Sequence, residues 1–156
     1  MGYITDLRKL VGSRPLLHVG ACVLLINNDD EILLQLRQDN NCWGLSGGSL
    51  ELGESLEEVA KRELLEETGL VATTLNLFNI YSGEDLYYKY PHGDEVYNVV
   101  AAYLCNEYTG ALKKDEMEVK DLKFFHINNL PTNISPPDLP IIKEYKMTFV
   151  NRKETS

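Results

Sequence analysis

The spacing of apolar residues along the chain changes several times, and each spacing predicts a helix or a strand. Helical spacing over residues 3–12 ends at Gly12, which predicts a short N-terminal helix. Residues 18–38 are typical of two strands joined by a tight turn at 27–30, and the first of these strands is apolar on both faces. Such a strand is expected at a buried, central position of a sheet.

The same signals predict the remaining elements of the chain. They are, in order, a Gly-rich connection over 40–54, a helix from Ser55 to Gly69, a strand over 70–82, a strand over 95–105, an acidic loop leading into a strand over 114–127, and a closing helix over 136–150. No repeat or linker interrupts them. We therefore expect a single α/β domain over residues 1–156 with a mixed sheet, in which residues 1–14 form an N-terminal helical extension.

The helix that begins at Ser55 places acidic and apolar residues on one side. Ser55 and Glu58 form a capping-box pattern, and Gly69 is a typical residue at the end of a helix. At about 100° per residue, Glu63 and Glu67 share the sector of the apolar residues. An acidic run on a helix is usually a solvated face, but a solvated face would avoid that sector.

A bound cation is the alternative interpretation of these acids. Buried carboxylates are unfavourable unless a positive charge neutralises them, and Arg62 points away from the apolar sector and is not expected to reach all three acids. Oxygen ligands grouped in this way suit Mg²⁺ or Mn²⁺, with water and substrate phosphates as further ligands. We therefore predict a divalent-metal site at Glu63, Glu66 and Glu67.

Charge and composition narrow the class of protein. The formal net charge is −9, and residues 48–70 carry seven glutamates against Lys61 and Arg62, which argues against general binding of a nucleic-acid polymer. The cysteines at 22, 42 and 105 show no disulfide or zinc spacing, and neither a signal peptide nor an apolar run of membrane-spanning length is present. We expect a cytoplasmic protein without membrane partners, and a homodimer through the N-terminal segment stays open.

Residues 48–70, GSLELGESLEEVAKRELLEETGL, resemble the Nudix box, whose pattern is G-x5-E-x7-R-E-U-x-E-E-x-G-U with U aliphatic. All nine fixed positions are filled, by Gly48, Glu54, Arg62, Glu63, Leu64, Glu66, Glu67, Gly69 and Leu70. The stretch W-G-L-x-G-G before the box and the elements around it are also similar to a Nudix domain. The resemblance implies an α/β/α sandwich with a loop–helix–loop active site, and hydrolysis of a nucleoside diphosphate linked to another moiety.

The resemblance also implies roles for individual residues. Glu63, Glu66 and Glu67 would bind Mg²⁺, or Mn²⁺ in its place, with the carbonyl of Gly48 as a further ligand. Glu54 and Arg62 would form an ion pair that supports the site. The family hydrolyses its substrates by attack of water on phosphorus, with metal ions to activate the water and a carboxylate to take its proton.

The identity of that carboxylate stays open. Glu66 or Glu67 is the first candidate for the base, and Glu116 in the loop KKDEMEV is the second, followed by Glu118. An exposed acidic loop is the alternative for the last two. One departure from the family is Ser46, where many Nudix proteins have Pro, and we expect it to loosen the loop without removing a ligand.

The substrate is less well defined by the sequence. Arg37 is a candidate for binding a substrate phosphate, with a surface salt bridge as the alternative. Trp43 is interpreted as a packing residue rather than a base-stacking one. Tyr87 and Tyr88 lie 17 and 18 residues after the box, which is similar to the dinucleoside-polyphosphate hydrolases of the family, although tyrosines that pack across a sheet explain them as well.

Three function hypotheses follow. The first is a Mg²⁺-dependent pyrophosphohydrolase of the Nudix type acting on a nucleotide-like small molecule. The second is a Nudix-like module that binds nucleotides without catalysis, and the third is a structural domain whose acids are solvated. The complete box favours the first, since non-catalytic modules of this kind tend to lose box glutamates.

Overall fold

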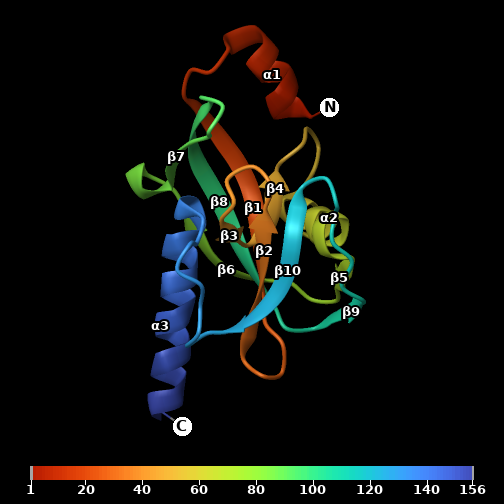
Figure 1. Ribbon diagram of the computed structural model, residues 1–156, viewed down its shortest axis with the longest axis vertical. Coiled ribbons are helices and arrows are strands. Elements are labelled where there is room, and N and C mark those ends of the chain that lie inside the picture. The colour runs from red at the N-terminus through yellow and green to blue at the C-terminus, as the bar shows by residue number, and fades with distance from the viewer. Residues whose placement is uncertain (1, 156) are drawn as a thin grey trace.

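The computed structural model describes residues 2–155, with side chains as far as residue 152. The helices and strands, in chain order, are α1 (Tyr3–Val11), β1 (Leu16–Leu25), β2 (Glu31–Arg37), β3 (Trp43–Gly44), β4 (Ser46–Ser49), α2 (Leu56–Thr68), β5 (Leu70–Ala72), β6 (Asn76–Tyr81), β7 (Tyr87–Lys89), β8 (Glu95–Cys105), β9 (Tyr108–Gly110), β10 (Val119–His126) and α3 (Leu139–Thr155). Short 3₁₀ turns lie at Glu84–Leu86 and Pro136–Asp138. Helix α1 lies at one end of the molecule and the C-terminus of α3 at the other (Figure 1).

A mixed sheet forms the centre of the fold. Its strand order is β4-β1-β8-β6, and β7 pairs with the beginning of β8. Strands β1 and β8 run parallel from the Leu16–Val96 pair to the Leu25–Cys105 pair, while β4 and β6 are antiparallel to their neighbours. A second sheet has the order β10-β2-β3, and β5 pairs with β9. The predicted mixed α/β class and the central position of the first strand are both confirmed.

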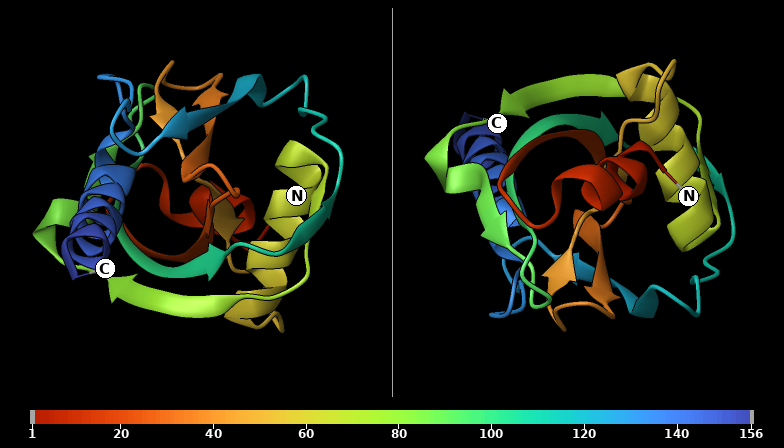
Figure 2. Two further views of the ribbon diagram at one scale, coloured as in Figure 1. Left: turned by 90° about the horizontal axis from the view of Figure 1, so that it is seen from below. Right: turned by 90° about the horizontal axis from the view of Figure 1, so that it is seen from above.

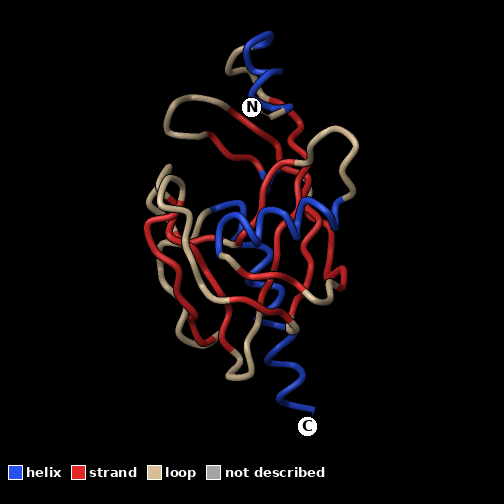
Figure 3. The backbone as a smooth tube through the Cα atoms, turned by 90° about the vertical axis from the view of Figure 1, so that its right-hand side faces the viewer, coloured by secondary structure: helices blue, strands red, loops and turns tan. Residues whose placement is uncertain are grey.

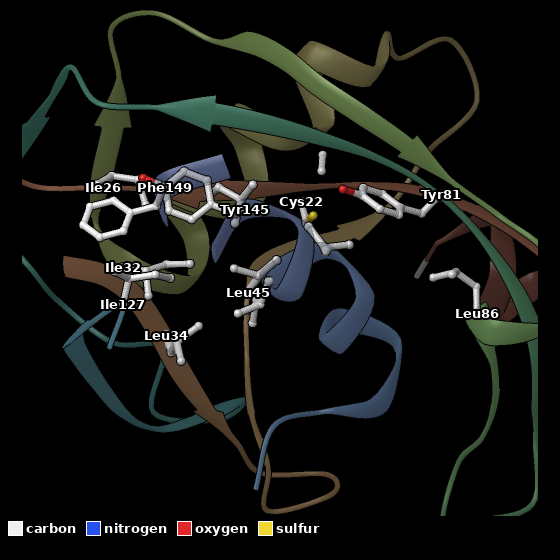
Figure 4. Packing of buried hydrophobic residues seen from close by; sticks show 14 residues of the cluster. Cys22, Ile26, Ile32, Leu34, Leu45, Tyr81, Leu86, Ile127, Tyr145 and Phe149 are labelled. Carbon is white, nitrogen blue, oxygen red and sulfur yellow. The ribbon is translucent and has the colours of Figure 1, made fainter. Parts of the chain in front are cut away.

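Strand β1 separates two apolar cores, because successive side chains of a strand point to opposite faces. Ala21 and Val23 pack with buried residues of α2, whereas Cys22 and Leu24 pack with buried residues of α3. Figure 4 shows the second core, in which Cys22, Ile32 and Leu45 lie around Tyr145 and Phe149. The two helices therefore lie on opposite sides of the strands (Figure 2), as the α/β/α sandwich requires.

The predicted turn between the first two strands is present. Asn27 holds it, because its side-chain oxygen accepts hydrogen bonds from the N–H groups of Asp29 and Glu31, both at 3.0 Å. Only a single bridge, between Ile26 and Ile32, joins the strands beyond the turn. Strands β1 and β2 then diverge into different sheets, which the sequence did not predict.

Two other predicted elements were wrong in detail. The single strand expected over 70–82 is two strands, because the chain bends at Thr73, whose N–H donates to the Glu107 carbonyl at 2.8 Å. The Gly-rich connection over 40–54 contains β3 and β4. Glycine is unfavourable in strands, but a Cβ at Gly47 would collide with the Ala21 carbonyl, so glycine is what allows β4 to pair with β1 here.

The three predicted helices are present, and α3 is longer than expected. Arg8 anchors α1 by donating hydrogen bonds to the carbonyls of Gly12, Arg14 and Glu95, and the helix projects beyond the strands (Figure 3). The ring of Trp43 packs edge-on against Phe125, at 4.9 Å between centroids, in agreement with the packing interpretation. In the described part of the chain, no helix has the length and apolar character needed to span a membrane, and all three cysteines are free.

Candidate active site

Helix α2 is fixed at both ends by the residues that the sequence predicted. The Ser55 hydroxyl oxygen accepts a hydrogen bond from the Glu58 N–H at 3.1 Å, and the Glu58 carboxylate accepts one from the Ser55 N–H at 3.3 Å. Gly69 ends the helix with a φ of 78°, a left-handed conformation that favours glycine. The caps and the burial of Val59 and Leu64 against β1 fix the rotation of the helix, which directs its acids toward β4.

Glu67 is the most buried of the three box acids, with 5% of its surface exposed. One carboxylate oxygen accepts hydrogen bonds from the Ser46 hydroxyl, at 2.9 Å, and from the Gly47 N–H, at 3.0 Å. The other oxygen accepts a hydrogen bond from the side-chain amide of Gln35 at 3.1 Å. All of these partners are neutral, so they orient the carboxylate without neutralising its charge.

Glu63 is held by an arginine instead. Arg62 donates a hydrogen bond to its carboxylate at 2.9 Å, and the same guanidinium binds both carboxylate oxygens of Glu54, at 2.8 and 2.9 Å. Arg62 also donates to the Ser49 carbonyl at 3.2 Å. The Glu54–Arg62 ion pair implied by the resemblance is therefore present, and it ties the loop before α2 to the helix and to the end of β4.

Glu66 differs from the other two acids because its side chain is 54% exposed. Its nearest cationic partner is again Arg62, at 3.5 Å. Arg62 thus contacts two of the three acids, rather than pointing away from the whole group. Among the side chains that the structure describes, up to residue 152, no three of His, Cys, Asp or Glu converge on one point as metal ligands do. The arginine occupies the space between Glu63 and Glu66.

The electrostatics of the buried acids show a shortage of positive charge. Burial raises the pKa of Glu63 to about 7, an effect that Arg62 opposes and that Glu66 and Glu118 reinforce. Burial also raises the pKa of Glu67 to about 8, with a further contribution from the neighbouring Glu63. In contrast, the hydrogen bond from Arg62 lowers the pKa of the partly buried Glu54. Glu63 and Glu67 therefore form a pair whose ionised state needs a cation, and their oxygen atoms suit a divalent one.

Gly48 brings the backbone of β4 against this pair. A Cβ at Gly48 would collide with the carboxylate of Glu63, so no other residue fits while Glu63 holds its position. Gly48 pairs with Ala21 of β1 and lines the same cavity as Glu63 and Glu67. The glycines before the box thus bring backbone close to the acids, as well as shaping the chain.

A cavity of about 690 Å³ extends from the box acids across β1 to the 3₁₀ turn that precedes α3. Of the residues predicted for the site, it is lined by Gly48, Arg62, Glu63, Glu67, Arg37 and Tyr88. The lining does not include Glu54, Glu66, Glu116 or Tyr87. The structure therefore brings together most of the predicted site and leaves four of its members beside or away from the cavity.

The two loop acids lie in different places. Glu116 is exposed and does not line the cavity, whereas Glu118, the lower-ranked of the pair, lines it and adds to the negative charge felt by Glu63. Arg37 forms a bidentate ion pair with Asp39, at 2.9 and 2.7 Å, and also faces the cavity. The salt bridge is thus present, and it leaves the Arg37 guanidinium beside the cavity.

The two tyrosines predicted for substrate binding, Tyr87 and Tyr88, also lie in different places. Tyr88 lines the cavity, accepts a hydrogen bond from the Asn40 amide at 3.0 Å and packs edge-on against Tyr90, at 4.9 Å between centroids. Tyr87 packs on Tyr97 instead, and its hydroxyl donates to Glu95. Alternation along β7 explains the difference, because adjacent strand residues point to opposite faces.

Three residues around the site were not among those predicted: Asp138 lines the large cavity, Gln35 lines a second, smaller cavity, and Ser46 lines neither. Gln35 is 2% exposed. A polar residue within the otherwise apolar stretch ILLQL of β2 was the signal that could have identified it from the sequence. Ser46 was expected to loosen the loop, but it is paired with Val23 in β4 and contacts Glu67. Asp138 accepts a hydrogen bond from the Leu45 N–H at 3.0 Å, and burial raises its pKa to about 6.

The chain is similar to several known proteins. A family model described as the NUDIX domain matches residues 16–145. A protein of Methanocaldococcus jannaschii named ADP-ribose pyrophosphatase is 36% identical over 144 residues, which cover 90% of this chain and 79% of that protein. A protein of Vibrio cholerae named NAD-capped RNA hydrolase NudC is 33% identical over 113 residues, covering 70% of this chain but 38% of that protein.

The fold has relatives among solved structures. The crystal structure of a MutT NUDIX hydrolase from Burkholderia pseudomallei is similar with a TM-score of 0.71, covering 82% of this chain and 97% of that one. The two sequences are 23% identical, so this likeness bears on the fold alone.

Proposed function

The chain belongs to the Nudix family and is a Nudix hydrolase, and on this basis we propose that it cleaves, with a divalent cation, the pyrophosphate bond of a nucleoside diphosphate linked to another moiety. Within that class, ADP-ribose is the first candidate. The relative named ADP-ribose pyrophosphatase covers most of this chain, which supports this choice.

One observation carries the metal dependence. Glu67 is buried and Glu63 partly buried at the wall of the cavity, and the arginine beside them reaches Glu63 but donates no hydrogen bond to Glu67. A divalent cation would neutralise the pair, and bound there it would polarise the phosphates and activate water. Mg²⁺ is the first choice for an all-oxygen set of ligands, and Mn²⁺ the second.

We assign the residues of the site as follows. Glu63, Glu66 and Glu67 hold the cation, with the carbonyl of Gly48 as a further ligand, and the Glu54–Arg62 ion pair keeps the loop and helix together. Glu66 or Glu67 is the base that accepts the proton of the attacking water. Of the loop acids, Glu118 is the better alternative than Glu116, because it lines the cavity.

The far part of the cavity is assigned to the nucleoside. Tyr88 and Tyr90 offer aromatic surface there, and Arg37 offers a positive charge. A dinucleoside polyphosphate is the second candidate substrate, since the position of Tyr88 after the box is similar to that branch of the family. We favour a small molecule over a polymer, because a net charge of −9 opposes contact with a phosphate backbone.

The free cysteines and the exposed residues of α1 support proposals about location and assembly. A cytoplasmic protein fits the free cysteines. A homodimer through α1 fits the exposure of Tyr3 and Leu10, which are 42% and 84% exposed. Light scattering on the purified protein would measure the mass of the assembly directly.

A hydrolysis screen tests the proposed function. The panel contains ADP-ribose, dinucleoside polyphosphates, nucleoside triphosphates including oxidised ones, CDP-linked compounds, nucleotide sugars and NAD-capped RNA. Each is incubated with Mg²⁺, with EDTA, and with EDTA followed by excess Mg²⁺. Reactions in ¹⁸O-water, read by mass spectrometry, identify the phosphorus atom that water attacks.

We expect ADP-ribose to give AMP and ribose 5-phosphate with Mg²⁺, no turnover in EDTA, and recovery when the metal is restored. Turnover that persists in EDTA would contradict the metal dependence. Faster cleavage of another substrate class would overturn the assignment of ADP-ribose as the substrate but would leave the proposed type of reaction intact. Failure to cleave any member of the panel would favour a binding module without catalysis.

A further inference from the structure

Glu67 is the only box acid held by uncharged groups on both of its oxygens. Its partners come from two strands, Gln35 from β2 and Ser46 and Gly47 from β4, while Glu67 itself lies on α2. Strands β2 and β4 belong to different sheets. The carboxylate of Glu67 therefore lies where the two sheets meet the catalytic helix, and its position depends on all three.

These contacts leave Glu67 with both a fixed orientation and its negative charge. A carboxylate has about four acceptor sites, and the three hydrogen bonds on Glu67 occupy three of them. Neutral donors stabilise the ionised form, as the lowering effects of Gln35, Ser46 and Gly47 on its pKa indicate. An arginine in the same place would compete with a metal ion for the carboxylate, whereas a hydroxyl and an amide do not.

We propose that Ser46 and Gln35 are positioning residues that hold the carboxylate of Glu67 as a preorganised ligand for the divalent cation. The proposal rests on the proposed function, because it requires that cation. Ser46 stands where many Nudix proteins have Pro, which lacks a hydroxyl. Its side chain thus supplies a contact to the box that a proline there would not.

The amide group of Gln35 makes a second contact besides the one to Glu67. Its amide nitrogen donates to Glu67 and also to the Leu45 carbonyl, at 3.4 Å, which fixes the orientation of the side chain. Its oxygen is the one buried side-chain polar atom in the described part of the chain without a hydrogen-bond partner. Gln35, Glu67 and Glu118 line a smaller cavity of about 340 Å³.

A buried acceptor without a partner is unfavourable, so a glutamine at this position is explained by its amide nitrogen, which donates to Glu67 and to the Leu45 carbonyl.

The test measures metal binding by the full-length protein without substrate, by Mn²⁺ electron paramagnetic resonance. The variants are Ser46→Ala, which removes the hydroxyl, Ser46→Thr, which keeps it, Gln35→Leu, and the Ser46→Ala/Gln35→Leu double variant. Ser135→Ala is the matched control for metal binding alone, because Ser135 is also 5% exposed but its hydroxyl accepts a hydrogen bond from Asn40 in the substrate part of the cavity rather than contacting Glu67. Steady-state kinetics with the best substrate are measured in parallel.

We expect Ser46→Ala and Gln35→Leu each to weaken Mn²⁺ binding about 10-fold, and the double variant by up to about 100-fold, the range found for residues that support metal ligands. In the kinetics, kcat falls by a similar factor while KM for substrate changes little. Ser46→Thr retains most of the wild-type affinity, and Ser135→Ala retains all of it.

The outcomes separate this inference from the proposed function. If wild-type protein binds no Mn²⁺, both fail together. If wild type binds Mn²⁺ and the folded Ser46→Ala and double variants bind it equally well, only the positioning role fails. Equal losses in Ser46→Thr, or in the Ser135→Ala control, would also overturn it, because the effect would then not depend on the hydroxyl contacting Glu67.

Discussion

The two parts of the large cavity are built in different ways. Around the box acids, the charged groups of the lining other than Glu118 come from the continuous stretch 46–67, which forms β4, the loop after it and α2. Around Tyr88, the groups come from segments far apart in the chain, such as Asn40, Ser135 and Asp138. In the first part, residue spacing on one helix determines which side chains meet. In the second, the tertiary fold determines it.

This difference explains why the reaction class is easier to infer than the substrate. The reacting phosphates need charge and geometry that a short motif supplies, whereas the remainder of the substrate meets single residues from several elements. Substitutions in the two parts should therefore act differently. Those around the box should lower kcat for every substrate, and those around Tyr88 should change KM and the choice of substrate.

The largest effect is expected at Glu67. Glu67→Gln keeps the size of the side chain but removes the charge, so a cation loses an anionic ligand worth several kcal/mol, or roughly a 1,000-fold loss in kcat/KM. The measurement is hydrolysis at saturating Mg²⁺. The matched control is Glu57→Gln, an exposed acid on the same helix, which should retain wild-type kcat/KM. Comparable losses in both variants would contradict a special role for Glu67 and would support the alternative that the box acids form a solvated helix face.

The next largest effect is expected at Arg62. Arg62→Lys keeps a positive charge but loses the planar fork that binds both oxygens of Glu54. We expect kcat to fall about 10- to 100-fold, with a much smaller change in KM. Glu54→Gln should give a similar loss, and the double variant should be little worse than either alone, since the two residues act as a pair. Additive losses would mean that they act separately.

Tyr88 and Tyr87 test the other part of the cavity. Tyr88→Ala removes an aromatic surface that would stack on a base, so KM should rise roughly 10-fold, in line with about 1–3 kcal/mol for one such contact. Tyr87→Ala should leave KM within about twofold, because that ring packs on Tyr97 outside the cavity. A larger effect at Tyr87 would support the original prediction that it binds substrate and would contradict the placement of the nucleoside.

The same contrast limits what the sequence could predict about the fold. The cap at Ser55 and the strand over 95–105 were predicted correctly, because each is specified by neighbouring residues. The short strand β4 was missed, because its glycines have low strand propensity and are explained only by close contact with β1. The separation of β1 from β2 depends on β10 and β8, which no local pattern reports.

The site shows the same division. The spacing of Glu63 and Glu67 predicted two acids on a buried face of the helix, and both are buried or partly buried. The contacts of Ser46 and Gln35 with Glu67 were not predicted, since they join residues 21 and 32 positions apart. Glu116 was ranked above Glu118 from sequence position alone, and only the path of the loop into β10 distinguishes which of them reaches the cavity.

The smallest effect on catalysis is expected at Ser55, although its effect on stability is measurable. Ser55→Ala removes the hydroxyl that caps α2, which should cost about 1 kcal/mol of stability and lower the Tm by about 2–4 °C in a chain of this size. The helix keeps its packing on β1 and β4, so kcat/KM at 25 °C should stay within about twofold of wild type. Calorimetry and hydrolysis on the same sample measure both quantities. A large loss of kcat/KM with an unchanged Tm would mean that the acids depend on the cap directly, and that packing of α2 against the sheet is not enough to hold them in place.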